Sequence, residues 1–397
     1  MTESVPEAGT GPLSGVRVLD LSRIVAAPFA TMALGELGAD VLKVERSGAG
    51  DDSRTWGPPF IEGESAYYLA VNRNKRSVCL DLSSVADQEV VRRLATEWAD
   101  VVVENYRAGS LERWNLSLES LRALNPRLVT ATLTGYPPGD TRPGYDFIAQ
   151  ADTGVMSLIG DPGGAPHKVG YPVADLSAGM FLLSGLLAAL YQREHTGRGQ
   201  HLTVSIWEAQ VAVQVNVNQS HLMTGARPRR LGNAHPQVAP YEMIRVADGF
   251  IAVAVANERQ FGHLAEALGL AELASDPRFS SNSARVANRA ELIARLETAT
   301  SALSSAGALG LLRRHDIACA QIRTIDEVLA SEEAQRAGTI VPLDHPTIGE
   351  IPVVRLPWRF SGAPTGPRTA PPLLGQHNDA VGEILASEPA RSQTLMP

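Results

Sequence analysis

The chain has 397 residues, a formal net charge of −8 and two cysteines, Cys79 and Cys319. A chain of this length exceeds what one hydrophobic core usually serves, so we expect two domains. The negative charge and the lack of a lysine and arginine cluster argue against nucleic acid or an anionic membrane as a partner, and the sparse cysteines argue against a disulfide framework or a cysteine-based zinc site.

Taken from the N-terminus, residues 1–15 are acidic and lack the apolar core of a secretory signal, so we expect a cytoplasmic protein. Short apolar strands then alternate with helical segments. The predicted strands are 16–22, 41–45, 101–105 and 128–134, and the predicted helices are 28–37, 87–99 and 117–124. This alternation predicts parallel βαβ units in an α/β fold with an open, doubly wound sheet. Ligands of such sheets bind outside the carboxyl ends of the strands, and we expect the chemistry there.

The first strand–helix turn does not carry a dinucleotide-binding fingerprint. It reads SRIVAAP (22–28) and contains no glycine. A pyrophosphate requires the spacing Gly-x-Gly-x-x-Gly at this turn, because side chains would block its approach to the backbone. Gly35 and Gly38 lie only at the far end of the predicted helix. A nicotinamide-dependent dehydrogenase is therefore disfavoured.

A single carboxylate, Asp175, stands between a Gly-Tyr-Pro turn (170–172) and a long apolar stretch. An aspartate just before a helix is a favoured N-cap, because its oxygen accepts a hydrogen bond from an unpaired backbone N–H. The same place also favours an ionised carboxylate that could attack an acyl carbon. The local sequence favours the cap. The apolar run 180–191, about twelve residues, is too short to span a bilayer and predicts a buried core helix.

The second half of the chain predicts a smaller domain. The glycine spacing of EHTGRGQ (194–200) predicts a turn, and the strand-like stretch HLTVSI (201–206) follows it. Residues 225–240 are rich in proline, glycine and arginine, as is typical of a linker. A strand is then predicted at 248–257, with helices around 259–268, 289–300 and 305–315, and the tail 340–376 is rich in proline and predicted to be extended.

Several blocks occur in order along the chain: LSRIVAAPFATMALGELGADVLKVE, NRNKRSVCLDL, ADVVVENYRAGSLER, GYDFIAQ, ADLSAGM, HTGRGQ and, near the end, APPLLGQHN. Together they resemble the class III (formyl-CoA transferase-like, CaiB/BaiF-type) CoA-transferases. The stretch GAGDDSRTWGPPF, with YYLAVNRNKRS after it, is similar to the subgroup that moves CoA from succinyl-CoA to another dicarboxylate such as glutarate. Each block alone is a weak signal, but their order across most of the chain is specific.

The resemblance implies an interlocked homodimer of ring-shaped chains, each with a large Rossmann-like domain and a smaller α+β domain. It places the N-terminal part of the large domain at 10–200, a linker at 201–240, the small domain at 241–325, and a C-terminal linker that returns to the large domain at 326–397. It also implies coenzyme A thioesters and carboxylic acids as substrates, with no metal and no tightly bound cofactor.

The family nucleophile is an aspartate in a motif that Ala174-Asp175-Leu176 matches, and this outweighs the cap interpretation. In the implied reaction the carboxylate attacks the acyl-CoA thioester and forms a mixed anhydride. The CoA thiolate then attacks the aspartyl carbonyl, which gives an enzyme–CoA thioester and releases the first acid. The acceptor acid repeats the exchange in reverse. A closed, apolar cleft would keep the anhydride from water, and neighbouring backbone N–H groups would hold the oxyanion.

Two groups of residues match family positions. The expected CoA contacts are Val25, Ala26, Arg46, Leu80, Asn105, Tyr106, Arg107 and Arg113, where the arginines suit phosphates because a guanidinium forms paired hydrogen bonds with them. The expected acyl-pocket residues are Trp56, Tyr145 and Asp146. We add Arg54 as a partner for an acceptor's distal carboxylate, with Arg73 as the next candidate.

Two alternatives stay open at this point. The first is an α-methylacyl-CoA racemase, which shares the fold but needs two acid–base groups. Its pattern places a histidine where this chain has Tyr145. A phenol with a pKa near 10 is a poor general base at neutral pH, so this substitution disfavours the racemase. A non-catalytic CoA-binding protein is the other. The chain also has GNAHPQVAPY (232–241) in place of a glycine-rich loop found in some members. The sequence does not identify the acceptor among succinate, glutarate, mesaconate, itaconate, citramalate and malate.

Overall fold

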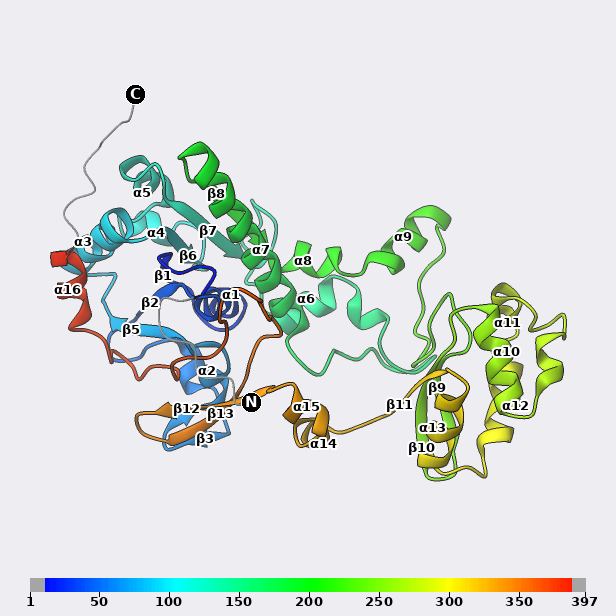
Figure 1. Ribbon diagram of the computed structural model, residues 1–397. Helices are drawn as coiled ribbons and strands as arrows, with labels where there is room; N and C mark the ends of the chain where they lie inside the picture. The colour runs from blue at the N-terminus through cyan, green and yellow to red at the C-terminus, as the bar shows by residue number, and fades with distance from the viewer. Residues whose placement is uncertain (1–10, 388–397) are drawn as a thin grey trace. The chain divides into compact units, whose positions relative to one another are not determined.

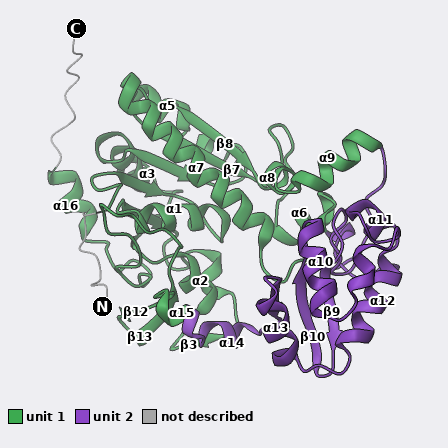
Figure 2. Cartoon of the chain, turned by 45° about the vertical axis from the view of Figure 1, so that its right-hand side comes forward, with its two compact units in different colours: residues 1–155, 168–224, 334–397 green, residues 156–167, 225–333 purple. Residues whose placement is uncertain are grey.

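The computed structural model describes residues 11–387, which fold into two compact units (Figure 2). Of the described residues, the larger unit comprises 11–155, 168–224 and 334–387, and the smaller comprises Met156–His167 and Gly225–Glu333. The chain therefore enters the smaller unit and returns to the larger one, so that segments far apart in sequence build the same core.

A six-stranded sheet forms the centre of the larger unit (Figure 1). From edge to edge it runs β5 (Lys75–Cys79), β2 (Asp40–Glu45), β1 (Arg17–Asp20), β6 (Val101–Glu104), β7 (Val129–Thr134) and β8 (His201–Ser205), and all neighbours are parallel. Counted along the chain, this is the order 3-2-1-4-5-6 of the Rossmann fold, which confirms the predicted α/β class and doubly wound sheet. The order reverses between β1 and β6, and a crevice is expected at their carboxyl ends.

The strands are apolar on both faces, as parallel strands covered by helices must be. Val18, Val41 and Val101 face one core with α1 (Ala26–Glu36), α7 (Val173–Thr196) and α8 (Ile206–Ala212). Their neighbours Leu19, Leu42 and Val102 face the other core, which α3 (Val85–Arg93), the π-helical turn Leu94–Trp98, α5 (Leu118–Leu124) and α16 (Ala380–Ser387) cover. Alternation along each strand thus divides its side chains between two helical layers.

Helix α7 is longer than the apolar run in the sequence suggested, and by length and composition it could cross a bilayer. Here it is a core helix, because Ala178, Leu182 and Leu186 are fully buried against the sheet and α1. Gly179 permits this packing: a Cβ atom there would lie 2.6 Å from the carbonyl oxygen of Ala26. The start of α1 is therefore held close to the first turns of α7.

One strand of the sheet departs from the predictions. Strand β5 was not predicted, because Lys75, Arg76 and Ser77 hide its apolar pattern, although Lys75 and Ser77 are buried. The strand-like stretch 201–206 is confirmed as β8, but the residues after it, which the resemblance placed in a linker at 201–240, form α8 and α9 (Val215–Thr224). Polar residues alternate with Leu202 and Val204 along β8, and these two pack against the core, so the segment is an amphipathic edge strand.

The C-terminal segment packs on the larger unit. Residues 340–354 form the hairpin β12 (Ile340–His345) and β13 (Gly349–Val354), where we had expected an extended tail. Further along, the His377 N–H donates to the Ser77 carbonyl and the Asn378 side chain accepts from the Cys79 N–H at 2.8 Å. Edge strand β5 is thereby covered by residues about 300 positions away.

The smaller unit is an α+β fold. Its antiparallel sheet has the order β11 (Ala318–Gln321), β10 (Gly249–Ala254) and β9 (Tyr241–Val246). Helices α10 (Glu258–Ala267), α11 (Asn282–Ala287), α12 (Arg289–Thr300) and α13 (Ser305–Arg314) accompany it, followed by α14 (Ile325–Leu329). Helix α15 (Glu332–Arg336) lies where the chain returns to the larger unit. The unit has its own apolar core, which includes Phe261, Phe279 and Leu292.

Short elements complete the larger unit. They are the 3-10 turn η1 (Asp52–Thr55), strands β3 (Phe60–Ile61) and β4 (Glu64–Ser65), helices α2 (Ala66–Val71), α4 (Ser110–Arg113) and α6 (Asp146–Asp152), and the 3-10 turn η3 (Val155–Ser157). Several of them follow the carboxyl ends of strands, where they supply side chains to the candidate site.

Candidate active site

A cavity of about 310 Å³ opens at the carboxyl ends of β2, β5 and β6, where ligands of doubly wound sheets bind. Four of the predicted CoA contacts line it, namely Arg46, Leu80, Tyr106 and Arg107. These residues follow three different strands, and the parallel sheet brings them together. The other lining residues include Arg23, Ser83, Ser110 and Trp114.

The cavity carries exposed positive charge. Arg107 forms no ion pair among the described residues, and Arg46 makes only a loose one, 3.8 Å from Asp52. Arg23 approaches the same Asp52 at 3.1 Å and stacks over the ring of Tyr106. Arg113 lies just behind the wall and donates to Ser110 Oγ at 3.1 Å. Guanidinium groups with free edges are suited to binding phosphates.

Three other predicted CoA contacts do not line this cavity. Asn105 uses both ends of its side-chain amide on the backbone of Arg23: it accepts from the N–H and donates to the carbonyl, each at 2.8 Å. Val25 and Ala26 are buried at the start of α1, and Val25 packs in an apolar cluster with Leu176. These residues therefore shape the turn between the cavity and α7.

Asp175 is the third residue of α7 and does not cap it, so the cap prediction is wrong. The N-cap position is Pro172, and the capping oxygen comes from α6: Asp146 Oδ1 accepts from the N–H groups of Ala174 (2.8 Å) and Asp175 (3.3 Å). Gln150 holds the other oxygen of Asp146 at 2.7 Å. Because Asp146 supplies the cap, the Asp175 carboxylate has no hydrogen-bond partner among the described residues.

The Asp175 side chain has an unusual electrostatic environment. The residue is 7% exposed, and burial raises the pKa of its carboxyl group to about 7, with a further contribution from the negative charge of Asp146. No described cation offsets these effects. A buried, unpaired carboxyl group with a perturbed pKa is a candidate for chemistry, because a purely structural carboxylate would be paired.

Aromatic residues gather beside this carboxyl group. Burial raises the pKa of Tyr67, and the charges of Asp175 and Asp146 raise it further, so the phenol stays protonated next to them. The ring of Tyr67 packs on that of Trp56, with centroids 5.0 Å apart. Tyr145 immediately precedes Asp146 and is exposed. The structure thus brings Trp56, Tyr67, Asp146 and Asp175 into one neighbourhood, and the role of Trp56, Tyr145 and Asp146 in an acyl pocket stays a prediction.

Sequence reasoning missed Tyr67 and Gln150, although both lie in stretches that were singled out. Gln150 is four residues after Asp146, a helical spacing that places the two side chains side by side. Tyr67 follows Ser65, whose hydroxyl caps the short helix α2. No local feature of the sequence shows that this turn faces Asp175.

Arg54 does not present a free guanidinium to a substrate. Its Nε and Nη2 donate to the two oxygens of buried Glu45 at 2.7 Å, and Nη1 lies 3.6 Å from Glu64. Its side chain is 9% exposed and stacks over Tyr68. Arg73 is likewise buried and paired with Glu36. Both arginines hold the fold together, so an acceptor's distal carboxylate needs other donors.

The structure also bears on metal binding and on the segment 232–241. Over residues 11–387, no group of three or more histidine, cysteine, aspartate or glutamate side chains could hold a metal ion. The segment 232–241, which stands in place of a glycine-rich loop, belongs to the smaller unit.

Comparison with known proteins gives a consistent result. The family described as CoA-transferase family III matches residues 13–378. A succinate–glutarate CoA-transferase of Agrobacterium fabrum is 40% identical over 97% of this chain and 98% of its own length. A human succinyl-CoA:glutarate CoA-transferase is 36% identical over 95% of this chain and 89% of its own. A crystal structure of a CaiB/BaiF family protein from Brucella suis, 40% identical, covers 95% of this chain and 100% of that one with a TM-score of 0.83.

Proposed function

Because this chain belongs to CoA-transferase family III and is an enzyme of that class, we propose that it moves CoA from succinyl-CoA to a second dicarboxylate, such as glutarate, through intermediates on Asp175. The observation that carries the mechanism is the buried Asp175 carboxyl group, whose oxygens have no hydrogen-bond partner among the described residues. The names of the Agrobacterium and human relatives support the choice of substrates.

The reaction proceeds by four exchanges. An oxygen of ionised Asp175 attacks the thioester carbon, the C–S bond breaks, and CoA leaves as a thiolate. The thiolate attacks the aspartyl carbonyl of the resulting anhydride, which releases succinate and leaves CoA on Asp175. The acceptor carboxylate then attacks this thioester and expels CoA, and the thiolate finally attacks the acceptor's acyl carbon and regenerates Asp175. Protons and electrons balance without a metal or redox cofactor.

Each attack creates an oxyanion that needs a hydrogen-bond donor. The first N–H groups of α7 already have acceptors. The N–H of Val173 donates to the Tyr171 carbonyl and that of Leu176 to the Pro172 carbonyl. The N–H groups of Ala174 and Asp175 donate to the Asp146 carboxylate. The sequence-based expectation of backbone donors therefore does not fit the start of α7. The protonated hydroxyl of Tyr67 is the donor that we propose in their place.

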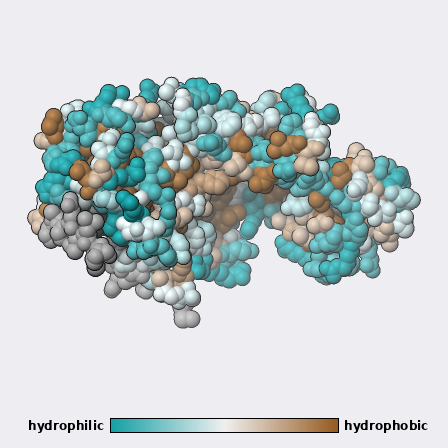
Figure 3. All heavy atoms as spheres, turned by 90° about the horizontal axis from the view of Figure 1, so that it is seen from above, coloured by the Kyte–Doolittle hydropathy of each residue, from teal (hydrophilic) through white to brown (hydrophobic). Residues whose placement is uncertain are grey.

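We also propose that a second copy of the chain completes the enzyme, as the interlocked homodimer of the family implies. Figure 3 shows hydrophobic residues reaching the surface on the face seen from above. On α7, α8, α9 and the turn between the last two, the exposed large apolar residues are Met180, Phe181, Tyr191, Val213, Val215, Leu222 and Met223. No residue of α9 is buried, so this helix needs a partner to cover it.

Light scattering tests the oligomer. The expected mass is twice 42.3 kDa for the native chain and lower for Leu222→Glu combined with Met223→Glu. Val85→Glu, which charges an equally exposed apolar residue on α3, is the matched control and should leave the mass unchanged. A monomeric native protein would contradict the homodimer.

The activity is tested by incubating the protein with succinyl-CoA and a panel of acids and following new acyl-CoA species by mass spectrometry. We expect glutaryl-CoA from glutarate and much less product from pentanoate, which lacks the second carboxylate. With succinyl-CoA alone, hydroxylamine should trap an adduct at Asp175. Full transfer by Asp175→Ala would contradict the covalent mechanism, and deuterium uptake at the α-carbon without new acyl-CoA would indicate a racemase.

A further inference from the structure

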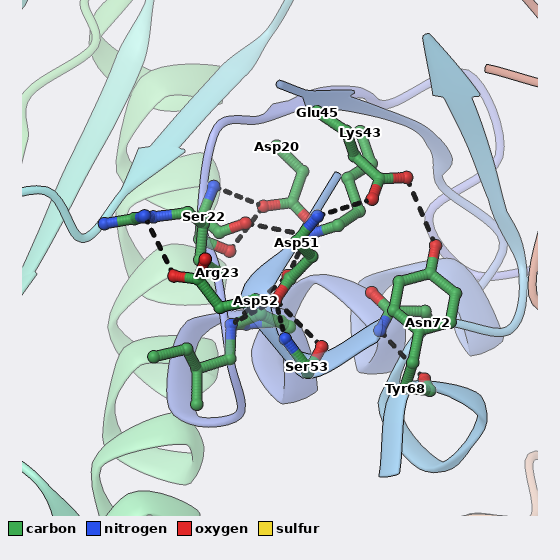
Figure 4. A network of polar contacts seen from close by, with 12 residues as sticks. Asp20, Ser22, Arg23, Lys43, Glu45, Asp51, Asp52, Ser53, Tyr68 and Asn72 are labelled. Carbon is green, nitrogen blue, oxygen red and sulfur yellow. Dashed lines mark hydrogen bonds and ion pairs between the residues drawn. The ribbon is translucent and has the colours of Figure 1, made fainter. Parts of the chain in front are cut away.

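In the turn between β1 and α1, side chains bond to five consecutive backbone polar groups, from the Ser22 N–H to the Ile24 N–H, and Figure 4 shows part of this network. The N–H of Ser22 donates to Asp20 at 2.9 Å, and its carbonyl accepts from the buried ammonium of Lys43 at 2.7 Å. The side-chain amide of Asn105 accepts a hydrogen bond from the N–H of Arg23 and donates one to its carbonyl. In a dinucleotide-binding protein these N–H groups would face a pyrophosphate, but here they are already paired.

Ile24, the next residue, is in a strained conformation. Its φ is 75°, in the left-handed region that a β-branched residue rarely adopts. Such a conformation persists only where its surroundings hold it in place. The contact that does so is Asp51, whose two carboxylate oxygens share the Ile24 N–H at 3.1 and 3.2 Å.

Asp51 is a charged anchor rather than a flexible surface group. It forms an ion pair of 2.9 Å with Lys43, and both side chains are completely buried. It also accepts from the N–H and the hydroxyl of Ser53. Burial opposes its ionisation, but the charge of Lys43 and these hydrogen bonds outweigh burial and lower the pKa of Asp51 to about 2. The ion pair therefore holds both ends of the turn, Ser22 through Lys43 and Ile24 through Asp51.

The turn connects the two halves of the proposed site. The side chain of Arg23 lines the cavity. Ile24 and Val25 pack in one apolar cluster with Leu176, the residue next to Asp175. A change in the backbone at Ile24 would therefore move the contact surface of α7 relative to the cavity.

We propose that Asp51 is a positioning residue for CoA transfer: by holding Ile24 in the left-handed conformation, it sets the Ile24–Val25 surface against Leu176 and so aligns Asp175 with a thioester bound in the cavity. This inference rests on the proposed function for its kinetic consequences. Its structural part, that Asp51 holds the turn, can be measured without any activity.

The experiment combines Asp51→Asn with two substitutions of Ile24. Glycine adopts a φ of 75° without strain, whereas alanine does not. We expect Asp51→Asn to lower kcat for succinyl-CoA and glutarate by about tenfold or more, because a small misplacement of reacting groups has a large effect on rate. KM for succinyl-CoA should change little. Adding Ile24→Gly should restore part of kcat, and adding Ile24→Ala should not.

Hydrogen exchange of the peptide 21–27 provides the readout that is independent of activity. Asp51→Asn should accelerate exchange there, and Ile24→Gly should slow it again. The neighbouring change Asp52→Asn is the matched control and should leave exchange in 21–27 unaltered, because its partners among residues 11–387, outside its own turn, are the side chains of Arg23 and Arg46 and not the backbone. Unchanged exchange in a folded Asp51→Asn protein would overturn the inference.

A variant that keeps Asp51 covers the case in which Asp51→Asn does not fold. Ile24→Gly alone should then retain a higher kcat than Ile24→Ala, although glycine removes more of the side chain. A role for Ile24 in packing alone predicts the opposite order, and that order would overturn the inference. If the native enzyme transferred no CoA at all, the proposed function would fail, and hydrogen exchange would still decide whether Asp51 holds the turn.

Discussion

Replacing Asp175, the proposed nucleophile, should make the protein more stable. In the folded chain the pKa of Asp175 rises from 3.8 to about 7, mainly through burial and secondly through Asp146. The folded state therefore binds this proton more tightly than the unfolded state does, so stability falls as pH rises from about 4 to about 7 and stays reduced above it. The charged form of Asp175 is what destabilises the fold.

The size of the effect follows from the shift. About three pKa units at about 1.4 kcal/mol each give roughly 4 kcal/mol against folding at pH 8. The positive end of α7 offsets part of this. We expect Asp175→Asn, which cannot ionise, to gain about 2–4 kcal/mol at pH 8 and well under 1 kcal/mol at pH 4, while losing transferase activity.

The assay is urea unfolding followed by circular dichroism at both pH values. Glu119→Gln is the matched control, because Glu119 is also in the first turn of a helix, α5, but is exposed. It should lose up to about 1 kcal/mol at pH 8, since a carboxylate at that position is stabilising. The raised pKa would be refuted by either of two results: Asp175→Asn no more stable than the native chain at pH 8, or a gain in unfolding free energy at pH 4 as large as the gain at pH 8.

The remaining predictions concern pH, the cavity and the arginine beside it. The value of kcat/KM should rise with pH, with a midpoint near the Asp175 pKa of about 7, as Asp175 ionises. Asp146→Asn removes the neighbouring negative charge but can still cap α7, so it should move this midpoint to lower pH. Arg107→Ala should raise KM for succinyl-CoA about tenfold or more, equivalent to about 1.5–3 kcal/mol, with a smaller fall in kcat. Equal falls in kcat and kcat/KM, with KM unchanged, would place Arg107 elsewhere. Arg54→Gln should destabilise the protein by about 3–5 kcal/mol in urea unfolding, because Glu45 is left buried and unpaired. The ratio of activity with glutarate to activity with pentanoate should stay unchanged. A stable variant in which this ratio falls to near one would place Arg54 in the acceptor pocket.

The sequence predicted the centre of the fold well because the physical signal there is local. Strands β1, β2, β6 and β7 contain short apolar stretches, such as Val101–Val103, which are typical of strands buried on both faces, although β2 also holds the buried Lys43. Strand β5 escaped prediction because its buried lysine and serine belong to a polar network that the tertiary structure assembles. Strand β8 was visible in the local pattern HLTVSI, whereas α8 and α9 after it were missed because the resemblance placed 201–240 in a linker.

The site shows the same division. The sequence identified Asp175, but its role as a cap was predicted from neighbouring residues, whereas the actual cap comes from Asp146, 29 residues earlier. Arg54 was chosen because it lies near Trp56 in sequence. Its partner, Glu45, belongs to β2, and burial of that carboxylate is a tertiary property. Local sequence therefore indicates which residues can do chemistry and gives little information about which are already engaged.

The covering of β5 by the C-terminal segment has a consequence for how the chain is made. The partners of Ser77 and Cys79 are His377 and Asn378, and Asn74 bonds with Gly366, Arg368 and Thr369. A nascent chain on the ribosome lacks these residues until translation has passed residue 378, about 300 residues after β5, so the sheet keeps an open edge until then. Such long loops must close before the native pairing forms, which makes this edge a late event in folding. The exposed edge is then the surface that a chaperone would have to protect.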